Sequence, residues 1–225
     1  MRTLAFGDIH GCYDSLASLW EEVNPTPEDT LIFLGDYVDR GPHSKQVIDF
    51  LLEKMRQFSL IRLTGNHEEK FLLSRIYDFE IEAWIEDWDA IATLDSYGIN
   101  NHTDPITSDA IPKSHWEFLR TCRPFYETAT HIFIHASVEY DLPLIEQQPY
   151  TLIHKKLAIQ DQPHVSGKII VCGHTAQKNH KPLDLGHTIC IDTDAGRDGW
   201  VTCLDVDQRT YWQANQEKKT RTGKL

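Results

Sequence analysis

Short runs of mostly apolar residues recur along the chain, and each is followed by polar residues, usually with a glycine among them. The first three runs occupy residues 2–6, 30–34 and 60–64, and two more occupy residues 131–136 and 168–172. Runs of this length and composition are typical of strands that are buried on both faces of a sheet. The pattern therefore predicts buried strands whose ends lead into polar loops.

Two of the intervening segments have the periodicity of amphipathic helices. Residues 13–23 and 44–58 carry apolar side chains three or four positions apart, as at Leu16, Leu19 and Val23. Strands that alternate with helices predict an α/β fold. Ligands bind beyond the carboxyl ends of the strands in open α/β sheets, so the polar loops form the candidate binding region.

The pattern changes twice in the remainder of the chain. Residues from about 70 to 125 are more helical and less regular, which predicts a helical insertion near the candidate binding region. Closely spaced short runs after residue 168 predict a final β-meander. We expect a single domain over residues 1–215 and a flexible tail over residues 216–225, because the tail is polar and basic.

The chain is acidic. Its 225 residues include 22 lysines and arginines against 34 aspartates and glutamates, which gives a formal net charge of −12. We therefore expect no nucleic-acid partner, because the electrostatic footprint of such proteins is basic. An anionic substrate would also be repelled, unless bound cations reverse the sign of the local field.

The five cysteines include no C-x-x-C pair, which argues against a disulfide framework or a zinc knuckle. The apolar neighbours of Cys172, Cys190 and Cys203 predict core positions for these three. No apolar run approaches the roughly 18 residues of a membrane helix, and the first residues do not resemble a signal peptide. We expect a cytoplasmic monomer that does not contact membranes.

Side chains that can bind metals, transfer protons or bind phosphate stand at or just beyond the ends of all five predicted strands. In chain order they are Asp8 and His10, then Asp36, Asp39 and Arg40, then Asn66, His67 and Glu68, then His135, and finally His174. Each one alone is a weak indicator, since aspartate is also a common turn former. Together they offer nitrogen and oxygen ligands without cysteine, a set that suits manganese, iron or zinc rather than calcium or a thiolate cluster.

The motifs "GDIHG", "GDYVDRG", "GNHE", "HA" and "GHT" occur in this order, and the order resembles the calcineurin-like metallophosphoesterase superfamily. The spelling of the second and third motifs is similar to the phosphoprotein phosphatase branch, especially small bacterial serine/threonine-type protein phosphatases. The motifs span residues 7 to 175, and a last block, "IDTDAG", follows at residues 191–196. The resemblance implies one catalytic domain with an αββα sandwich of two sheets, and a metal-dependent phosphomonoesterase activity.

Two divalent metal ions are implied by this resemblance, with manganese expected first and iron or zinc as alternatives. The implied ligands are Asp8 and His10 for the first ion, Asp36 as the bridge, and Asn66, His135 and His174 for the second ion. A hydroxide held by both ions would attack the phosphorus atom directly. The implied substrate is a phosphorylated protein, with serine, threonine or tyrosine esters, or a small phosphoester.

The resemblance also implies roles in the chemistry itself. His67 would protonate the leaving oxygen, Asp39 would orient His67, and Arg40 would bind phosphate oxygens in a bidentate fork. Asn66 would contact the phosphate as well as a metal. Glu68 has two interpretations, either support for the neighbouring ligands or simply the start of a helix.

Two arginines that are usual in this branch are missing. Thr64 precedes "GNHE" where the family has arginine, and Lys156 stands where the second arginine is expected, with Lys155 as the alternative in register. Arg62 and Arg197 are candidate replacements. Because lysine lacks the planar fork of arginine, we expect an intact metal site whose substrate preference is altered.

Other functions compete with the protein phosphatase interpretation. A dinucleoside polyphosphate hydrolase of the bis(5'-nucleosyl)-tetraphosphatase type shares the motifs, although that branch often has "GNHD" where this chain has "GNHE". A phosphodiesterase is disfavoured because no basic track is visible. A binding module without activity is disfavoured because all six implied ligands are present.

The tripeptide Gly-His-Thr occurs twice, centred on His174 and on His187. His174 follows an apolar run and is expected at the carboxyl end of a strand, whereas His187 precedes one. We predict that His174 is the ligand. Antiparallel pairing of the two strands would nevertheless bring His187 near the site as well.

Overall fold

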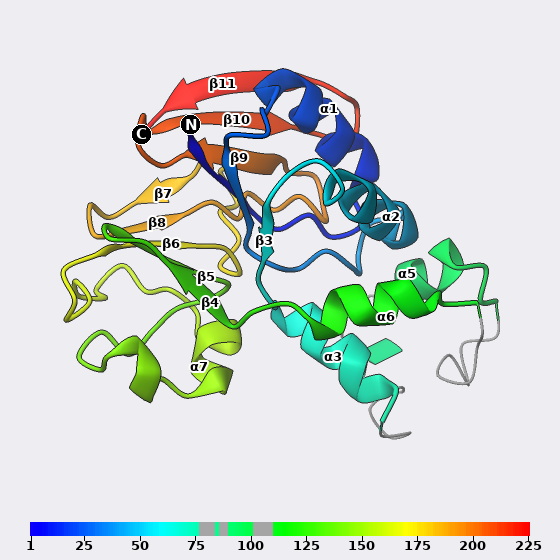
Figure 1. The fold of residues 1–225 in the computed structure, drawn as a ribbon, viewed down its shortest axis with the longest axis horizontal. Helices are drawn as coiled ribbons and strands as arrows, with labels where there is room; N and C mark the ends of the chain where they lie inside the picture. The colour runs from blue at the N-terminus through cyan, green and yellow to red at the C-terminus, as the bar shows by residue number, and fades with distance from the viewer. Residues whose placement is uncertain (77–83, 86–89, 101–109) are drawn as a thin grey trace.

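Two β-sheets form the centre of the molecule (Figure 1). The computed structural model describes residues 1–76, 84–85, 90–100 and 110–225. The strands of the first sheet are β1 (Thr3–Phe6), β2 (Thr30–Phe33), β3 (Leu60–Arg62), β9 (Val201–Asp205), β10 (Thr210–Ala214) and β11 (Thr220–Lys224). Those of the second sheet are β4 (Phe125–Glu127), β5 (His131–Ile134), β6 (Ile169–Cys172), β7 (Leu183–Asp184) and β8 (Thr188–Cys190).

All five apolar runs form strands, namely β1, β2, β3, β5 and β6. The strand order is β11-β10-β9-β1-β2-β3 in the first sheet and β4-β5-β6-β8-β7 in the second. The strands β1, β2 and β3 pair in parallel, and so do β5, β6 and β8. Three carboxyl ends therefore lie along one edge of each sheet, which is where the polar motifs begin.

The helices are α1 (Tyr13–Val23), α2 (Ser44–Lys54), α3 (Asn66–Ser74), α5 (Ile91–Ser96), α6 (Lys113–Arg120) and α7 (Pro149–His154), with a short 3₁₀ helix η1 (Leu144–Glu146). Figure 1 shows α1 and α2 beside the first sheet, α7 beside the second, and α3, α5 and α6 grouped together. The predicted insertion is helical in α5 and α6, while its residues 77–83, 86–89 and 101–109 lie outside the described residues. None of the described helices combines the length and the apolar character that crossing a membrane requires.

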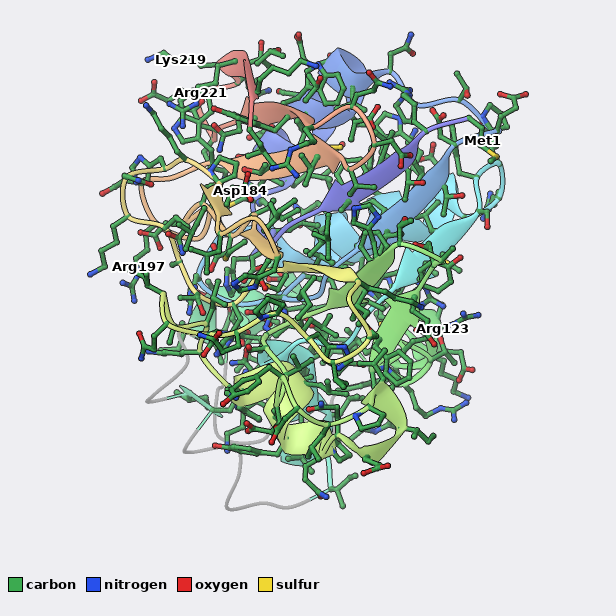
Figure 2. All side chains as sticks on the ribbon, turned by 90° about the vertical axis from the view of Figure 1, so that its left-hand side faces the viewer. Met1, Arg123, Asp184, Arg197, Lys219 and Arg221 are labelled. Atoms are coloured by element: carbon green, nitrogen blue, oxygen red, sulfur yellow. The ribbon has the colours of Figure 1, made fainter. Side chains whose placement is uncertain are left out.

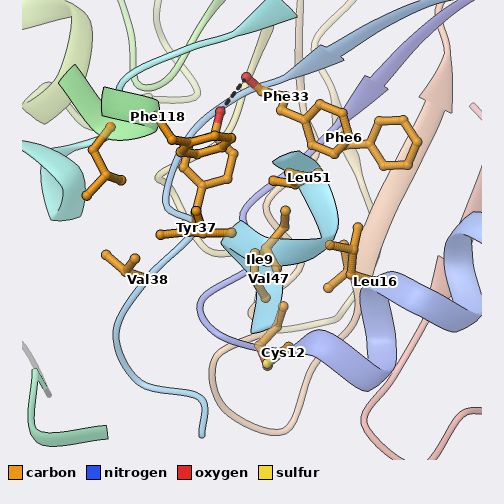
Figure 3. Packing of buried hydrophobic residues seen from close by; sticks show 14 of the residues in the cluster. Phe6, Ile9, Cys12, Leu16, Phe33, Tyr37, Val38, Val47, Leu51 and Phe118 are labelled. Atoms are coloured by element: carbon orange, nitrogen blue, oxygen red, sulfur yellow. Dashed lines mark hydrogen bonds between the residues drawn. The ribbon is translucent and has the colours of Figure 1, made fainter. Parts of the chain in front are cut away.

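Three clusters of buried apolar side chains hold the layers together. Between the sheets, Ala5 of β1 belongs to the same cluster as Phe133 of β5. On the outer face of the first sheet, Phe6 and Phe33 stack with ring centroids 4.5 Å apart and pack with α1 and α2 (Figure 3). On the outer face of the second sheet, β5 and β6 pack with Ile153 of α7. This order of layers confirms the αββα sandwich.

The C-terminal part of the chain differs from the prediction in two respects. The strands β9, β10 and β11 do form an antiparallel meander, but β6 and β8 belong to the other sheet and pair in parallel. The prediction of a flexible tail over residues 216–225 is also wrong, because Thr220–Lys224 forms β11 along the free edge of β10. Leu225 then packs onto the cluster between the sheets. The strand was not predicted because its sequence is polar. Its residues alternate between exposed and half-buried.

Deleting residues 219–225 is expected to lower the free energy of unfolding by about 2 kcal/mol, because the ladder to β10 and the packing of Leu225 are lost. In a domain of this size the melting temperature should fall by about 4–8 °C, which circular dichroism measures. Replacing the exposed Lys218 and Lys219 by alanine is the control and should shift it by no more than about 1 °C. An unchanged melting temperature after the deletion would contradict a structural role for β11.

Candidate active site

Side chains from both sheets meet where the parallel strands end. Asp36, after β2, lies at the centre of this group. Its Oδ2 atom is 3.4 Å from His10 Nε2, and its Oδ1 atom is 3.3 Å from His135 Nε2. Asp8 Oδ2 is 4.0 Å from the same nitrogen of His10. One carboxylate thus contacts a histidine from each sheet, as the position of a bridging ligand requires.

Asn66, the first residue of α3, extends the group. Its Oδ1 atom lies 2.9 Å from His135 Nε2 and 2.9 Å from His174 Nδ1. The donor atoms of Asp36, His135 and His174 all lie within 4.8 Å of one another. All six residues implied as metal ligands therefore lie in one continuous cluster.

The histidines direct lone pairs towards the centre of this cluster. His10 Nδ1 lies 3.0 Å from the carbonyl oxygen of Val38, and His135 Nδ1 lies 3.0 Å from that of Leu34. His174 Nε2 likewise faces a backbone carbonyl oxygen at 3.1 Å. Each ring donates its proton to the backbone, so the opposite nitrogen faces the carboxylate and amide oxygens with a lone pair. Lone pairs that converge in this way repel one another, and a cation removes the repulsion. The residues therefore fit a metal.

The electrostatics of the cluster agree with this fit. Burial lowers the pKa of His10 and of His135, and burial together with His135 lowers the pKa of His174 to about 4. The three rings are therefore neutral at pH 7, the form that binds a metal. Burial and neighbouring carboxylates raise the pKa of Asp8. A bound cation would offset this repulsion between carboxylates.

The backbone that carries three of the proposed ligands has an unusual conformation. His10, Asp36 and His174 have φ angles of 47°, 53° and 62°, in the left-handed region that side-chain-bearing residues seldom adopt. A side chain at Gly65 would collide with the Asp36 carboxylate, so glycine is required there. Strain of this kind persists only where the surrounding structure enforces it, and it is concentrated at functional sites.

His67 and Asp39 form a buried pair beside the cluster. His67 Nδ1 lies 2.7 Å from Asp39 Oδ2, and His67 Nε2 faces Asp36 Oδ2 at 3.9 Å. Burial lowers the pKa of His67, but the Asp36 and Asp39 carboxylates outweigh burial and raise it. This favours the protonated ring, which can donate a proton from Nε2. The donor atoms of His67, His10 and Asp36 also lie within 4.8 Å of one another, so the geometry allows His67 to bind a metal instead.

The Arg40 guanidinium lies against both histidines. Its Nη1 atom is 2.8 Å from His10 Nε2, and its Nη2 atom is 3.4 Å from His67 Nε2. Gly196 lets the last sequence block approach, because a Cβ atom there would come within 2.8 Å of Arg40 Cδ. A planar fork of N–H groups is thereby held next to the cluster of lone pairs.

The position of Glu68 agrees with both interpretations, support for neighbouring residues and the start of a helix. It lies in the first turn of α3, and its carboxylate accepts hydrogen bonds from the backbone N–H groups of Gly65, Asp36 and Tyr37 at 2.8–2.9 Å. Burial raises the pKa of Glu68 to about 8, against the effect of these three bonds. The contacts fasten the start of α3 to the loop that carries Asp36.

Neither candidate arginine takes the place of the missing ones. Arg62 donates to the carbonyl oxygen of Phe118 at 2.8 Å and covers the ring of that residue, so it points to α6. Arg197 is exposed, and Figure 2 shows it at the outer edge of the molecule. The position usual for arginine, Thr64, donates its backbone N–H to the carbonyl oxygen of Arg123. Arg40 is thus the guanidinium that lies in the described part of the site.

Lys156 lies close to the site in a segment that is fixed to it. The carbonyl oxygen of His154 bonds His174, and the backbone N–H of Leu157 donates to Thr175 Oγ1 at 2.9 Å. Lys156 itself is exposed. Lys155 instead pairs with a glutamate carboxylate at 2.7 Å, which leaves Lys156 as the candidate phosphate contact.

The second Gly-His-Thr copy lies elsewhere. Ile170 of β6 stands opposite Thr188 of β8 in a parallel pair, so His187 is at the amino end of its strand and His174 beyond the carboxyl end of its own. His187 Nδ1 lies 3.0 Å from Thr188 Oγ1. The antiparallel pairing that would have brought His187 to the site does not occur.

Replacing His174 with alanine is therefore expected to remove one of two Mn²⁺ ions per chain, whereas His187→Ala should retain both. Loss of a group that only supports a ligand costs about 10- to 100-fold in metal affinity, so loss of a nitrogen ligand should cost at least about 100-fold. Isothermal titration with Mn²⁺, supported by elemental analysis after dialysis, measures the stoichiometry. The reverse result for the two variants would overturn the assignment.

The motifs assign no role to three buried residues near the site. Asp192 follows β8 in the same way that the proposed ligands follow their strands, and it belongs to the block "IDTDAG". Trp84 and Thr93 both bond Asp39, but they lie in the insertion, where no motif indicates them. In the same block Asp194 has a φ angle of 65°.

Comparisons with known proteins relate this chain to phosphoesterases. The sequence model of the family described as calcineurin-like phosphoesterase matches residues 1–178. A Caenorhabditis elegans protein, named provisionally as a serine/threonine-protein phosphatase, is 40% identical over 78 residues, which are 34% of this chain and 21% of that protein. The symmetrical bis(5'-nucleosyl)-tetraphosphatase of Enterobacter sp. (strain 638) is 45% identical over 69 residues, which are 30% of this chain and 24% of that protein. The matched segments span less than a quarter of either relative.

A structural comparison extends over nearly the whole chain. A crystal structure named provisionally as that of a diadenosine tetraphosphatase superposes with a TM-score of 0.66 and 18% sequence identity, over 99% of this chain and 93% of that one. At this identity the likeness concerns the fold. The substrates of these proteins therefore do not transfer directly to this one.

Proposed function

Because the chain belongs to the calcineurin-like phosphoesterase family, we propose that it is a metal-dependent phosphomonoesterase that hydrolyses phosphoprotein esters. The observation that carries the proposal is the placement of the His67–Asp39 pair and the Arg40 guanidinium directly beside the cluster of convergent lone pairs. Cation binding, proton donation and phosphate binding are the three requirements of this hydrolysis.

Two divalent cations would be held by this chain, one by Asp8 and His10, the other by Asn66, His135 and His174, with Asp36 between them. When bound, such ions supply positive charge to phosphate oxygens and lower the pKa of a water molecule. They would also reverse the local effect of the net charge of −12. Manganese is the expected metal, and iron and zinc suit the same donors.

The remaining residues would act on the phosphate ester itself. Arg40 would bind two phosphate oxygens through parallel N–H groups. His67 would give its Nε2 proton to the leaving oxygen while its Nδ1 proton stays in the bond to Asp39. This transfer matters most for the alkoxide of a serine or threonine ester and least for a phenolate. Lys156 would add positive charge without bidentate geometry.

A cavity of about 460 Å³ beside Arg40 supports an ester that carries an apolar or aromatic group. It is lined by Arg40, Ile85, Ile91, Ala92, Asp95 and Gly196. Of these residues Arg40 supplies positive charge and Asp95 negative charge, so the cavity suits one phosphate at Arg40 with an apolar group against the isoleucines. We therefore include phosphotyrosine among the proposed substrates, with phosphoserine and phosphothreonine.

A dinucleoside polyphosphate hydrolase is the second candidate. The 45% identity to the bis(5'-nucleosyl)-tetraphosphatase segment supports it. A chain of four phosphates, however, requires several cationic contacts. Among the described residues that line the cavity, Arg40 is the one that carries a positive charge. The cavity therefore favours a monoester.

The proposal is tested by loading the purified protein with Mn²⁺ and comparing turnover of five substrates. These are p-nitrophenyl phosphate, diadenosine tetraphosphate, and phosphoserine, phosphothreonine and phosphotyrosine peptides. We expect metal-dependent hydrolysis of the monoesters, with kcat/KM highest for the aryl esters. No turnover on any substrate would exclude the enzyme, and turnover confined to the dinucleotide would establish the second candidate.

A further inference from the structure

We infer that Trp84 and Thr93, two residues of the helical insertion, are positioning residues that hold the Asp39 carboxylate and, through it, the ring of His67. The inference rests on the proposed function, since it assigns to these two side chains the orientation of the proton donor. Neither residue belongs to a sequence motif, and neither touches the proposed metal ligands in the contacts of the described chain.

Among the residues that the structure describes, three side chains bond the Asp39 carboxylate. Its Oδ2 atom accepts hydrogen bonds from His67 Nδ1 at 2.7 Å and from Trp84 Nε1 at 2.9 Å. Its Oδ1 atom accepts one from Thr93 Oγ1 at 2.7 Å. With both oxygens bonded from different directions, the carboxylate cannot rotate about its Cβ–Cγ bond without breaking a bond. The plane of the His67 ring is fixed in turn.

The single hydroxyl proton of Thr93 determines which groups donate in the remaining hydrogen bonds around Asp39. Thr93 has one hydroxyl proton, and that proton goes to Asp39 Oδ1. Thr93 Oγ1 therefore accepts both from the backbone N–H of Asp39, at 2.8 Å, and from Ser44 Oγ, at 2.9 Å. Ser44 Oγ in turn lies 3.2 Å from the same backbone N–H. One threonine hydroxyl thus binds the side chain and the main chain of Asp39 at once.

This double contact explains how the backbone at Asp39 is held. Asp39 and Arg40 have φ angles of 69° and 66°, two consecutive residues in the left-handed region. Such a pair is costly unless nearby groups enforce it. Thr93 and Ser44 supply the bonds to the Asp39 N–H group, so the insertion stabilises the turn that presents both Asp39 and Arg40.

Burial makes the orientation of the Asp39 carboxylate depend on its hydrogen bonds to Trp84 and Thr93. The side chains of Asp39, Trp84 and Thr93 are all fully buried. A buried carboxylate that loses a donor finds no water to replace it, and it reorients or leaves its charge unsatisfied. Trp84 is fixed in place by stacking on Phe71, with ring centroids 4.6 Å apart.

Loss of these contacts should mainly affect substrates with poor leaving groups. An alkoxide needs the proton of His67 in the transition state, and proton transfer depends on the direction of Nε2. A phenolate such as p-nitrophenolate leaves with little help. Loosening Asp39 should therefore reduce turnover of alkyl phosphates while turnover of aryl phosphates and metal binding persist.

Trp84→Phe is the first test, because it keeps the stacked ring and removes the N–H donor. Trp116→Phe is the matched control, because Trp116 packs on the same Phe71 ring from α6, with centroids 4.9 Å apart, and the described chain shows no bond from it to Asp39. We expect Trp84→Phe to lower kcat for a phosphoserine peptide by about tenfold to a hundredfold. Turnover of p-nitrophenyl phosphate should change by less than about threefold, KM should hold, and Trp116→Phe should match the wild type.

Thr93→Val is the second test, because valine has the shape of threonine without the hydroxyl. The same selective loss is expected, and Thr93→Ser should restore most of the lost turnover. A uniform loss on both substrates in Thr93→Val and Thr93→Ser alike would show that Thr93 acts only on folding.

A third readout does not depend on activity. In the metal-free protein at a pH above the pKa of His67, where the ring is neutral, its ¹⁵N shifts should report one tautomer with the proton on Nδ1, and Trp84→Phe should give a mixture. Unchanged shifts, together with a wild-type ratio of the two substrates, would overturn the inference. A wild-type protein that hydrolyses no phosphate ester would instead overturn the proposed function, and the ¹⁵N result would still decide whether Trp84 and Thr93 hold the pair.

Discussion

Replacing Asp36 with asparagine is expected to lower kcat/KM for p-nitrophenyl phosphate by at least about a thousandfold. Asp36 contacts His10 with one oxygen and His135 with the other, so both proposed ions lose a ligand in one substitution. Isothermal titration should show the loss of both Mn²⁺ sites. The rise in melting temperature that Mn²⁺ gives the wild type should disappear as well, because only a folded protein that binds the ion is stabilised by it.

Asp205→Asn is the control for this experiment. Asp205 is a buried carboxylate at the end of β9 that accepts backbone hydrogen bonds from Asp207 and Gln208. It stands opposite Leu4, near the amino end of β1 and therefore at the edge of the sheet away from the site. This variant should keep both ions. An Asp36→Asn protein that binds two ions and retains more than about a tenth of the activity would contradict the bridging role.

The second large effect is expected for His67→Asn. Asparagine removes the proton donor but keeps a polar side chain at the start of α3. Turnover of a phosphoserine peptide should fall by about 10²- to 10⁴-fold, and that of p-nitrophenyl phosphate by less than about tenfold. Metal content, measured by elemental analysis after dialysis, should not change.

The metal analysis makes this experiment decisive, because His67 also lies in a potential metal group with His10 and Asp36. If His67→Asn loses an ion, then His67 is a ligand and the proposed donor role is wrong. His164→Asn is the control. His164 is also buried, but its ring bonds Ser166 and the carbonyl oxygen of Leu142, in the segment between β5 and β6.

The sequence was informative wherever an apolar run fixed the end of a strand. Asp36 and His174 could be placed because each follows a run that cannot be anything but buried, so the loop after it must emerge at the sheet edge. The same reasoning predicted His174, rather than His187, as the ligand. It could not decide between parallel and antiparallel pairing, since residue spacing within a strand is the same in both.

Three features escaped prediction for different physical reasons. The sequence of β11 is as polar as that of a disordered tail. The segment forms a strand because it pairs with the free edge of β10. Arg62 was a candidate replacement for a missing arginine, but a carbonyl oxygen and an aromatic ring on α6 hold it away from the site. Trp84 and Thr93 reach Asp39 across about fifty residues of chain, a contact that no local pattern encodes.

The first sheet joins segments that lie far apart in the chain, since β1 pairs with β9. The backbone N–H of Gly7, next to Asp8, donates to the carbonyl oxygen of Thr202, and β1 pairs with β9 from Leu4 opposite Asp205. A chain emerging from the ribosome therefore carries its first proposed ligand long before the strand that holds it in place exists. Contacts between such distant segments form slowly. We therefore expect the loop that carries Asp8 to be fixed only after β9 has paired with β1.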